Sequence, residues 1–175
     1  MNEADRKRTD PSDERLSHVD GRGRAVMVDV GSKPVTARRA VAEGFVRIGP
    51  ELERAIRSGS VAKGPVLETA RLAGIMAAKR TDELIPMCHS IPLDSVAVEA
   101  TLEPGRVRIE ATVHAEGRTG IEMEALVAVS AACLTVFDMG KALDRSITID
   151  GIRVLEKHGG RSGSHVAEGR EATRA

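Results

Sequence analysis

Hydrophobic and polar residues alternate along two neighbouring segments near the middle of the chain. Residues 95–102 (SVAVEATL) and 107–114 (VRIEATVH) place an apolar residue at nearly every second position, which is typical of half-buried strands. Because Pro104 and Gly105 stand between them, the two segments predict a β-hairpin. Residues 37–48 are interpreted as a further strand, although the spacing of their apolar residues also allows a helix.

Three segments have the spacing or the terminal residues of helices. Residues 50–58 begin with proline and acidic residues and end near a basic residue. Residues 65–80 also begin with proline, and apolar residues recur along them at helical spacing. Residues 122–143 form the longest predicted helix, which has a face of small alanines. One apolar stripe of this helix contains Leu126, Cys133 and Phe137.

A last strand, residues 147–156, completes the predicted order β–α–α–β–β–α–β. Two helices on one face of an antiparallel sheet form a ferredoxin-like α+β domain, here with an extra helix in the first crossover. Because the core has almost no aromatic side chains, we expect the other face of the sheet to be buried by a second subunit.

The ends of the chain differ in composition from the domain between them. Residues 1–24 are half charged and contain little to bury, so we expect a mobile N-terminal tail. Residues 164–175 are polar, and we expect a flexible C-terminal tail there. The segment between them, residues 25–163, contains no linker and no internal repeat, so it is predicted to be one domain.

Composition argues against several classes of protein. The chain has 26 Lys and Arg against 26 Asp and Glu, and only 1% aromatic residues, so nucleic-acid binding is not expected. Two cysteines cannot form a disulfide framework or a four-cysteine zinc site. The uncharged apolar stretch 125–137 is too short to span a bilayer, and residues 1–10 lack the apolar segment of a secretory signal. We therefore expect a cytoplasmic protein without a membrane partner.

Residues 83–92 contain two prolines and cannot stay helical, so the Cys88-His89 pair lies in an irregular segment. His89 is either a proton carrier that also binds substrate or a capping side chain, and Cys88 is then a packed thiol. Adjacent cysteine and histidine rarely bind one ion, and the sequence has no second ligand cluster. No metal site is therefore predicted.

Two pairs of charged residues belong to the longest predicted helix. Glu122 and Glu124 open it, and they either stabilise its N-terminus or recognise a guanine-like edge through paired N–H donors. Asp138 and Lys141 lie three residues apart near its end. They form either a solvated ion pair or an acid/base couple tuned at the boundary of the apolar stripe.

Two further segments combine glycine with cations. Lys63-Gly64 precedes a predicted helix, where a lysine can hold an anion, but such pairs are also common in surface loops. Lys157 and Arg161 belong to the glycine-rich segment KHGGRSG, which suits phosphate binding or a flexible terminus. Together the cations and carboxylates favour chemistry on a phosphorylated small molecule.

Four segments resemble the MoaC family of cyclic pyranopterin monophosphate synthases, and the resemblance covers about residues 25–163. They are MVDVGSK (27–33), TARLAGIMAAKRTDELIPMCHSIPL (69–93), TGIEMEALVAVSAACLTVFDMGKA (119–142) and KHGGRSG (157–163). The resemblance implies a ferredoxin-like fold and a homohexamer, a trimer of dimers with active sites at subunit interfaces. It also implies a lyase of molybdenum cofactor biosynthesis. Its substrate would be 3′,8-cyclo-7,8-dihydroguanosine 5′-triphosphate, and its products would be cyclic pyranopterin monophosphate and diphosphate.

The resemblance further implies roles for the residues that match the motifs of the family. Asp138, Lys141, Lys63 and His89 would be catalytic. The implied substrate-binding residues are Met87, Cys88, His89, Glu122, Met123, Glu124, Lys157 and Arg161. No cofactor is expected, and a metal, if used, would be Mg²⁺ on the substrate phosphates.

Three positions depart from the pattern of the family. Ser90 stands where proline is usual, Pro65 where an acid is frequent and Arg161 where lysine is common. Because arginine keeps its charge and does not act as a general acid or base, Arg161 is expected only to bind phosphate.

A non-catalytic regulatory module that binds a small ligand on the same fold is the alternative function. Such a module would not require Lys63, Asp138 and Lys141 together.

Overall fold

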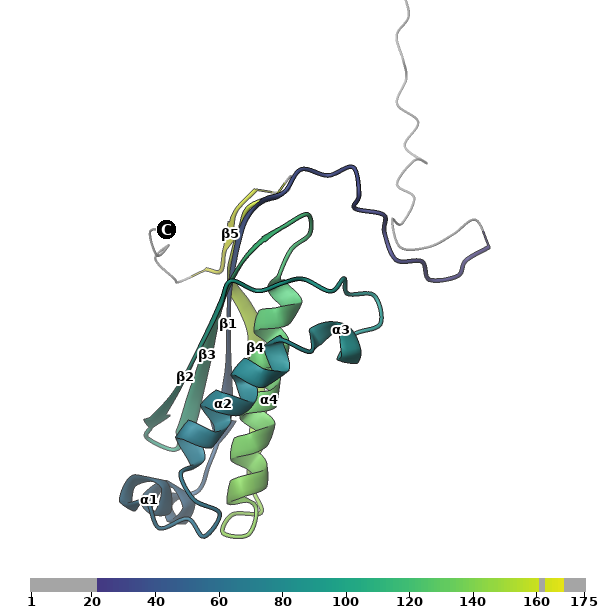
Figure 1. Cartoon of the computed structure of the whole chain (residues 1–175). Coiled ribbons are helices and arrows are strands. Elements are labelled where there is room, and N and C mark those ends of the chain that lie inside the picture. The colour runs from purple at the N-terminus through teal and green to yellow at the C-terminus, as the bar shows by residue number, and fades with distance from the viewer. Residues whose placement is uncertain (1–21, 161–162, 169–175) are drawn as a thin grey trace, which may run out of the picture.

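The computed structural model describes residues 22–160 and 163–168. Its elements are, in order, β1 (Thr36–Arg47), α1 (Pro50–Ser58), α2 (Val66–Ala78), α3 (Thr81–Leu84), β2 (Ser95–Glu103), β3 (Arg106–Gly117), α4 (Glu122–Gly140), β4 (Thr148–His158) and β5 (His165–Val166). The strands form one antiparallel sheet in the order β2-β3-β1-β4-β5. The predicted ferredoxin-like α+β fold is confirmed, with α1 as the extra helix of the first crossover (Figure 1).

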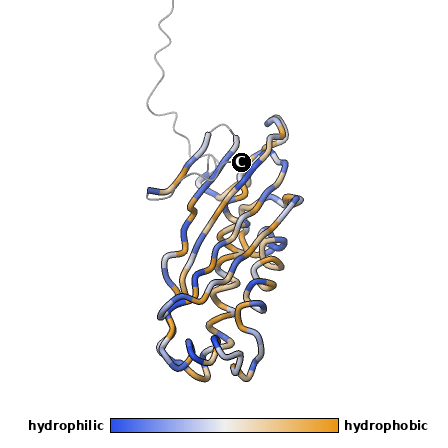
Figure 2. Tube along the Cα trace, turned by 90° about the vertical axis from the view of Figure 1, so that its left-hand side faces the viewer, coloured by the Kyte–Doolittle hydropathy of each residue, from blue (hydrophilic) through white to orange (hydrophobic). Residues whose placement is uncertain are grey.

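Helices α2 and α4 lie side by side on one face of the sheet, while α1 lies at one end of it (Figure 1). Apolar residues that alternate along β3 are completely buried under these helices, so the alternation in the sequence correctly identified the inner face. They are Val107, Ile109, Ala111 and Val113. The same alternation of apolar and polar positions is visible along the strands in Figure 2.

Helix α4 is the central core helix. Its length and composition alone would allow it to cross a membrane, but 56% of that stretch is buried inside the protein. It is apolar on several sides because it packs against both the sheet and α2. Two details of the predicted helix were wrong. It ends at Gly140 rather than at residue 143, and Phe137 is 37% exposed instead of lying on the buried stripe.

The short strand β5 was not predicted from the sequence. It pairs with the end of β4, where Val166 lies opposite Glu156. The expected N-terminal tail stays a prediction, since residues 1–21 lie outside the described part of the chain.

The sheet face opposite the helices carries ion pairs between neighbouring strands. Glu43 of β1 is 5% exposed, and its two carboxylate oxygens accept hydrogen bonds from Arg108 of β3 and Arg153 of β4. Glu156 is completely buried and pairs with Arg39. Buried carboxylates are tolerated here because arginine compensates for their lost hydration. That a second subunit covers this face stays a prediction.

Close contact between β1 and α4 depends on Gly44. A Cβ atom at this position would lie 2.7 Å from Cγ1 of Val129 and 3.0 Å from Cγ1 of Ile152. These separations are shorter than a normal van der Waals contact, so any side chain here would push the helix away from the sheet.

Gly44→Ala is therefore expected to lower the free energy of unfolding by about 1–3 kcal/mol, the usual cost of overpacking a core. Urea unfolding measures this change. Gly117→Ala is the matched control, because its Cβ would meet only ordinary contacts at 3.7 and 3.8 Å. Equal stability of the two variants would contradict the prediction.

Candidate functional site

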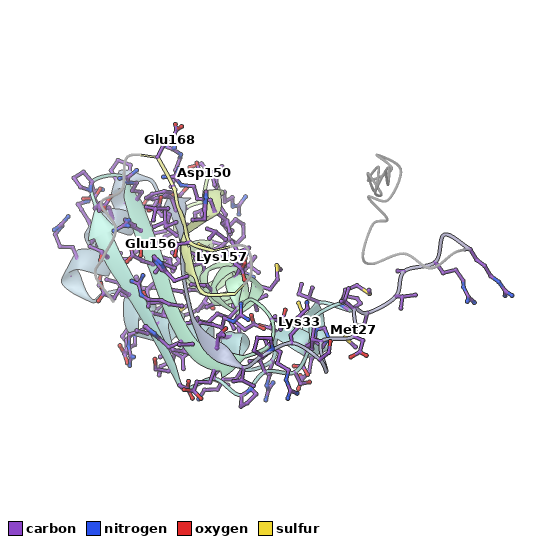
Figure 3. The ribbon with its side chains drawn as sticks, turned by 90° about the horizontal axis from the view of Figure 1, so that it is seen from above. Met27, Lys33, Asp150, Glu156, Lys157 and Glu168 are labelled. Atoms are coloured by element: carbon purple, nitrogen blue, oxygen red, sulfur yellow. The ribbon has the colours of Figure 1, made fainter. Side chains whose placement is uncertain are left out.

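A cavity of about 720 Å³ lies at the N-terminal end of α4. Its lining comes from residues 28–33, the loop 87–91, residues 119–124 and Lys157 of β4. Lys157 and Lys33, which is in the extended N-terminal segment, are labelled in Figure 3. Segments that are far apart in the sequence thus form one site.

Hydrogen bonds hold the loop that contains Cys88 and His89 against two neighbouring segments, the N-terminal segment and α3. The carbonyl oxygen of Val28 accepts a hydrogen bond from Nε2 of His89 at 2.8 Å, which holds the loop against the N-terminal segment. Nδ1 is then the ring nitrogen that can accept a proton. Ser90, one of the departures from the family pattern, donates from Oγ to the carboxylate of Asp82 in α3. Met87, Cys88 and His89 all line the cavity.

The two acidic residues in the first turn of α4 have different environments. Glu122 forms an ion pair with Lys157 at 2.7 Å. Glu124 is only 4% exposed, and its Oε2 is buried without a hydrogen-bond partner among the described residues. Burial raises the pKa of Glu124, and the charges of Glu122 and Asp82 raise it further. The N-cap residue of α4, Ile121, has no side chain that caps the helix, and the two roles expected for Glu122 and Glu124 stay predictions.

A second cavity of about 420 Å³ adjoins the first and is rich in cations. Lys33, Arg38, Arg118 and Lys157 line it, and Lys33 and Lys157 belong to both cavities. Nε of Arg118 also donates to the carbonyl oxygen of Lys33 at 3.1 Å, which fixes the N-terminal segment at this rim. Four cations around one hollow suit a phosphate chain.

Sequence reasoning missed Lys33, Arg38 and Arg118 as candidate site residues. They lie in different segments without a shared motif, and only the folded chain brings them together. The one available signal was that Lys33 lies inside the quoted motif MVDVGSK. Arg161 lies outside the described residues, so its predicted role in phosphate binding stays a prediction.

Lys63, Asp138 and Lys141 meet at the opposite end of α4. Nζ of Lys63 lies 2.6 Å from Oδ2 of Asp138 and 2.8 Å from its backbone carbonyl oxygen, and Nζ of Lys141 lies 2.7 Å from Oδ1. Lys63 is brought here by the turn that precedes α2, whose N-cap residue is Pro65. The structure thus joins all three residues, although Lys63 is 75 positions from Asp138 along the chain.

Burial of this cluster at a subunit interface stays a prediction, because solvent reaches all three side chains in the single chain. The side chains of Lys63, Asp138 and Lys141 are 45%, 55% and 56% exposed. Hydrogen bonds from Lys141 and Lys63 lower the pKa of Asp138 to about 2. Asp138 is therefore a carboxylate at neutral pH, and the lysines are the groups of this cluster that carry protons.

Within one chain, the cavity and the lysine cluster are separated by the length of α4. Sixteen residues of helix between Glu122 and Asp138 correspond to about 24 Å. The two groups of side chains therefore lie at opposite ends of α4.

The two cysteines occupy different environments. Cys133 is completely buried, and burial raises its pKa to about 12. Cys88 lines the cavity, and its pKa is raised by burial and then by the charges of Glu124 and Asp82. Both are thiols at neutral pH, which makes them poor nucleophiles. Within residues 22–160 and 163–168, no group of three His, Cys, Asp or Glu side chains is placed to hold a metal ion.

Comparison with known proteins agrees with this arrangement of motifs. The sequence profile of the MoaC family matches residues 27–160. The chain belongs to the MoaC family. A cyclic pyranopterin monophosphate synthase of Methylobacterium sp. (strain 4-46) is 58% identical over 156 residues, which are 87% of this chain and 97% of the relative. The synthase of Cereibacter sphaeroides (strain KD131 / KCTC 12085) is 55% identical over 85% of this chain and 94% of its own length.

A more distant source gives the same result. The cyclic pyranopterin monophosphate synthase of Chloroflexus aggregans (strain MD-66 / DSM 9485) is 56% identical over 152 residues, which are 86% of this chain and 92% of the relative. The part of the chain that matches the family includes the cavity, its cationic neighbour and the lysine cluster.

The buried carboxyl group of Glu124 predicts a pH-dependent stability. Because its pKa in the folded chain is raised above the ordinary value of 4.5, ionisation opposes folding. The contribution of the neutral acid to the free energy of unfolding is fully present below pH 4.5. It is lost as the pH rises through the pKa that Glu124 has in the folded chain. The neutral variant Glu124→Gln should therefore gain stability relative to the unmodified chain between acidic and neutral pH.

Urea unfolding of both proteins across this pH range measures the effect. A difference in unfolding free energy that stays constant with pH would contradict it, because Glu124 would then ionise equally in the folded and unfolded chains.

Proposed function

We propose that this chain is a lyase that converts 3′,8-cyclo-7,8-dihydroguanosine 5′-triphosphate to cyclic pyranopterin monophosphate and diphosphate. The observation that carries the proposal is the joined pair of cavities, in which a cationic hollow adjoins a pocket with a buried carboxyl group, whose Oε2 has no partner among the described residues. The larger cavity has the volume of a small-molecule site. Membership of the MoaC family and its similarity to cyclic pyranopterin monophosphate synthases support the same reaction.

The substrate is proposed to bind with its phosphates in the cationic hollow. Lys33, Arg38 and Arg118 would compensate for the phosphate charge, while Glu124 and His89 would contact the purine-derived rings. Mg²⁺ would enter only on the substrate phosphates, and we propose no further cofactor.

The lysine cluster would supply the proton transfers. Rearranging the ring system requires protons to move to and from nitrogen and carbon, which Lys63 and Lys141 can perform. Asp138 would stay ionised and hold both ammonium groups in place. In the last step a substrate hydroxyl attacks the α-phosphorus, its proton is removed, and diphosphate leaves as the new P–O bond forms.

A complete site is proposed to require two subunits. The cluster lies about 24 Å from the cavity in one chain, so a second copy would bring its own Lys63, Asp138 and Lys141 to the cavity. This supports the homohexamer, a trimer of dimers, implied by the resemblance. We also propose that the protein works in the cytoplasm.

The alternative function is a regulatory module that binds a ligand without turning it over. One observation favours it in the single chain, because the lysine cluster is exposed and distant from the cavity. Turnover assays separate the two functions.

Lys141→Ala is expected to abolish turnover while leaving assembly and substrate binding largely intact. Asp138→Asn should do nearly the same, and the double variant should be little worse, since members of one catalytic unit are not additive. Single-turnover formation of cyclic pyranopterin monophosphate and size-exclusion chromatography provide the measurements. Arg54→Ala, an exposed cation of α1 outside the four quoted segments, is the control and should remain active. An active Lys141→Ala variant would remove this residue from the catalytic cluster.

Mixing two inactive variants tests whether the site is shared between subunits. Lys141→Ala lacks the cluster and Lys157→Ala lacks a cavity residue, so neither homo-oligomer should turn over substrate. In randomly mixed oligomers, about a quarter of shared sites combine an intact cluster with an intact cavity. Co-refolded mixtures should therefore recover about that fraction of activity. Mixtures that remain inactive, although mass spectrometry shows mixed oligomers, would mean that each site belongs to a single chain.

A further inference from the structure

The lysine cluster is assembled from two separate segments of the chain. Asp138 and Lys141 lie at the C-terminal end of α4, whereas Lys63 lies in the loop between α1 and α2. Val61, in the same loop, is 6% exposed and anchors the loop in the core. The position of the Lys63 ammonium group therefore depends on how α1 and its loop are held against the end of α4.

One acidic side chain connects the turn after α4 to the start of α1. Oδ2 of Asp144 accepts a hydrogen bond from the backbone N–H of Gly49 at 2.6 Å. Its Oδ1 accepts from the backbone N–H of Ser146 at 2.8 Å and from Oγ of Ser146 at 2.6 Å. These bonds lower the pKa of Asp144. The bond from the Ser146 side chain has the largest effect, and the bond from the Gly49 backbone has the next largest.

The bond to Gly49 fixes the start of α1. Gly49 is the N-cap residue of α1, and its backbone N–H donates to Asp144. In a capping box, the side chain at the third helical position accepts from this N–H, and here a carboxylate from a distant turn does so. A carboxylate beside the N-terminus of a helix is also favoured by the helix dipole.

Apolar packing completes the connection. Leu52 of α1 is completely buried, and a Cβ atom on Gly140 would lie 2.4 Å from its Cδ2 atom. Leu52 thus packs directly on the last residue of α4, next to Lys141. The backbone N–H of Asp144 also donates to the carbonyl oxygen of Gly140 at 3.1 Å, which closes the turn that begins with Lys141.

We propose that Asp144 is a positioning residue for the proposed reaction, which holds the Lys63 loop and the Lys141 turn in register around Asp138. The inference rests on the proposed function. Asp144 itself acts only through the two lysines. Its loss should lower kcat rather than raise KM, because the cavity that binds substrate lies at the other end of α4.

Asp144→Ala is the main test variant, and it is measured in the full-length protein well below its melting temperature. We expect kcat to fall about tenfold, since small displacements of catalytic groups have effects of this order. KM should stay within about twofold of the unmodified enzyme. Asp144→Asn retains one acceptor oxygen and should recover most of the lost kcat.

Glu53→Ala is the matched control. Glu53 also fastens α1, because its Oε2 accepts a hydrogen bond from the backbone N–H of Gly105 at 2.9 Å, but it does not contact the Lys141 turn. A general loosening of α1 would lower kcat equally in both alanine variants and would overturn the proposal. A folded Asp144→Ala variant with unchanged kcat would overturn it as well. If Asp144→Ala does not fold, Ser146→Ala decides, because it removes the 2.6 Å hydrogen bond from Oγ of Ser146 that orients Oδ1 of Asp144, and an unchanged kcat in that variant counts against the role.

Amide hydrogen exchange separates failure of this inference from failure of the proposed function. Asp144→Ala should speed exchange in both residues 59–64 and residues 141–146, and Glu53→Ala should leave the second segment unchanged. This measurement needs no substrate. Unmodified protein that shows no turnover would reject the proposed reaction, while the exchange pattern would still decide whether Asp144 joins the two segments.

Discussion

The close packing of α4 against the sheet and α2 is the constraint on which the rest of the structure depends. Gly44 on β1 allows the helix to approach, and the buried residues of α4 complete the core. The same helix carries Glu122 and Glu124 at its first turn and Asp138 at its last. Since the helix is rigid, the requirement for a packed core also sets the spacing of the two groups of polar side chains. Under the proposed function, this spacing is the reason why one subunit cannot form a site alone.

The two ends of α4 favour opposite protonation states in chemically similar groups. At the first turn, burial raises the pKa of Glu124 and favours the neutral acid. At the last turn, Lys141 and Lys63 lower the pKa of Asp138, so that its carboxylate is ionised. Carboxyl groups whose environments separate their pKa values can take different roles in one reaction. In the proposed enzyme, Glu124 would recognise the substrate, whereas Asp138 would organise the lysines that transfer protons.

Local patterns predicted the fold better than they predicted the site. The hairpin of β2 and β3 could be identified because each strand buries one face, so its alternation is visible in the sequence. The end of α4 could not be identified from the sequence, because the turn after Gly140 depends on contacts with α1, which is distant in the sequence. The exposure of Asp138 was missed for a related reason. The apolar run before it continues to Phe137, which is partly exposed, so hydrophobicity alone did not mark the boundary of the core.

The carboxylate network on the open face of the sheet restricts how this sequence can evolve. Glu43 is almost inaccessible to water and is bonded by Arg108 and Arg153 together. Replacing either arginine alone would leave a buried charge only half compensated, whereas replacing all three residues by apolar ones of similar volume can leave stability unchanged. Sequences in which only one of the arginines has been replaced are less stable than the present sequence and than one in which all three residues have been replaced. Positions 43, 108 and 153 should therefore change together among descendants of this chain or remain as they are.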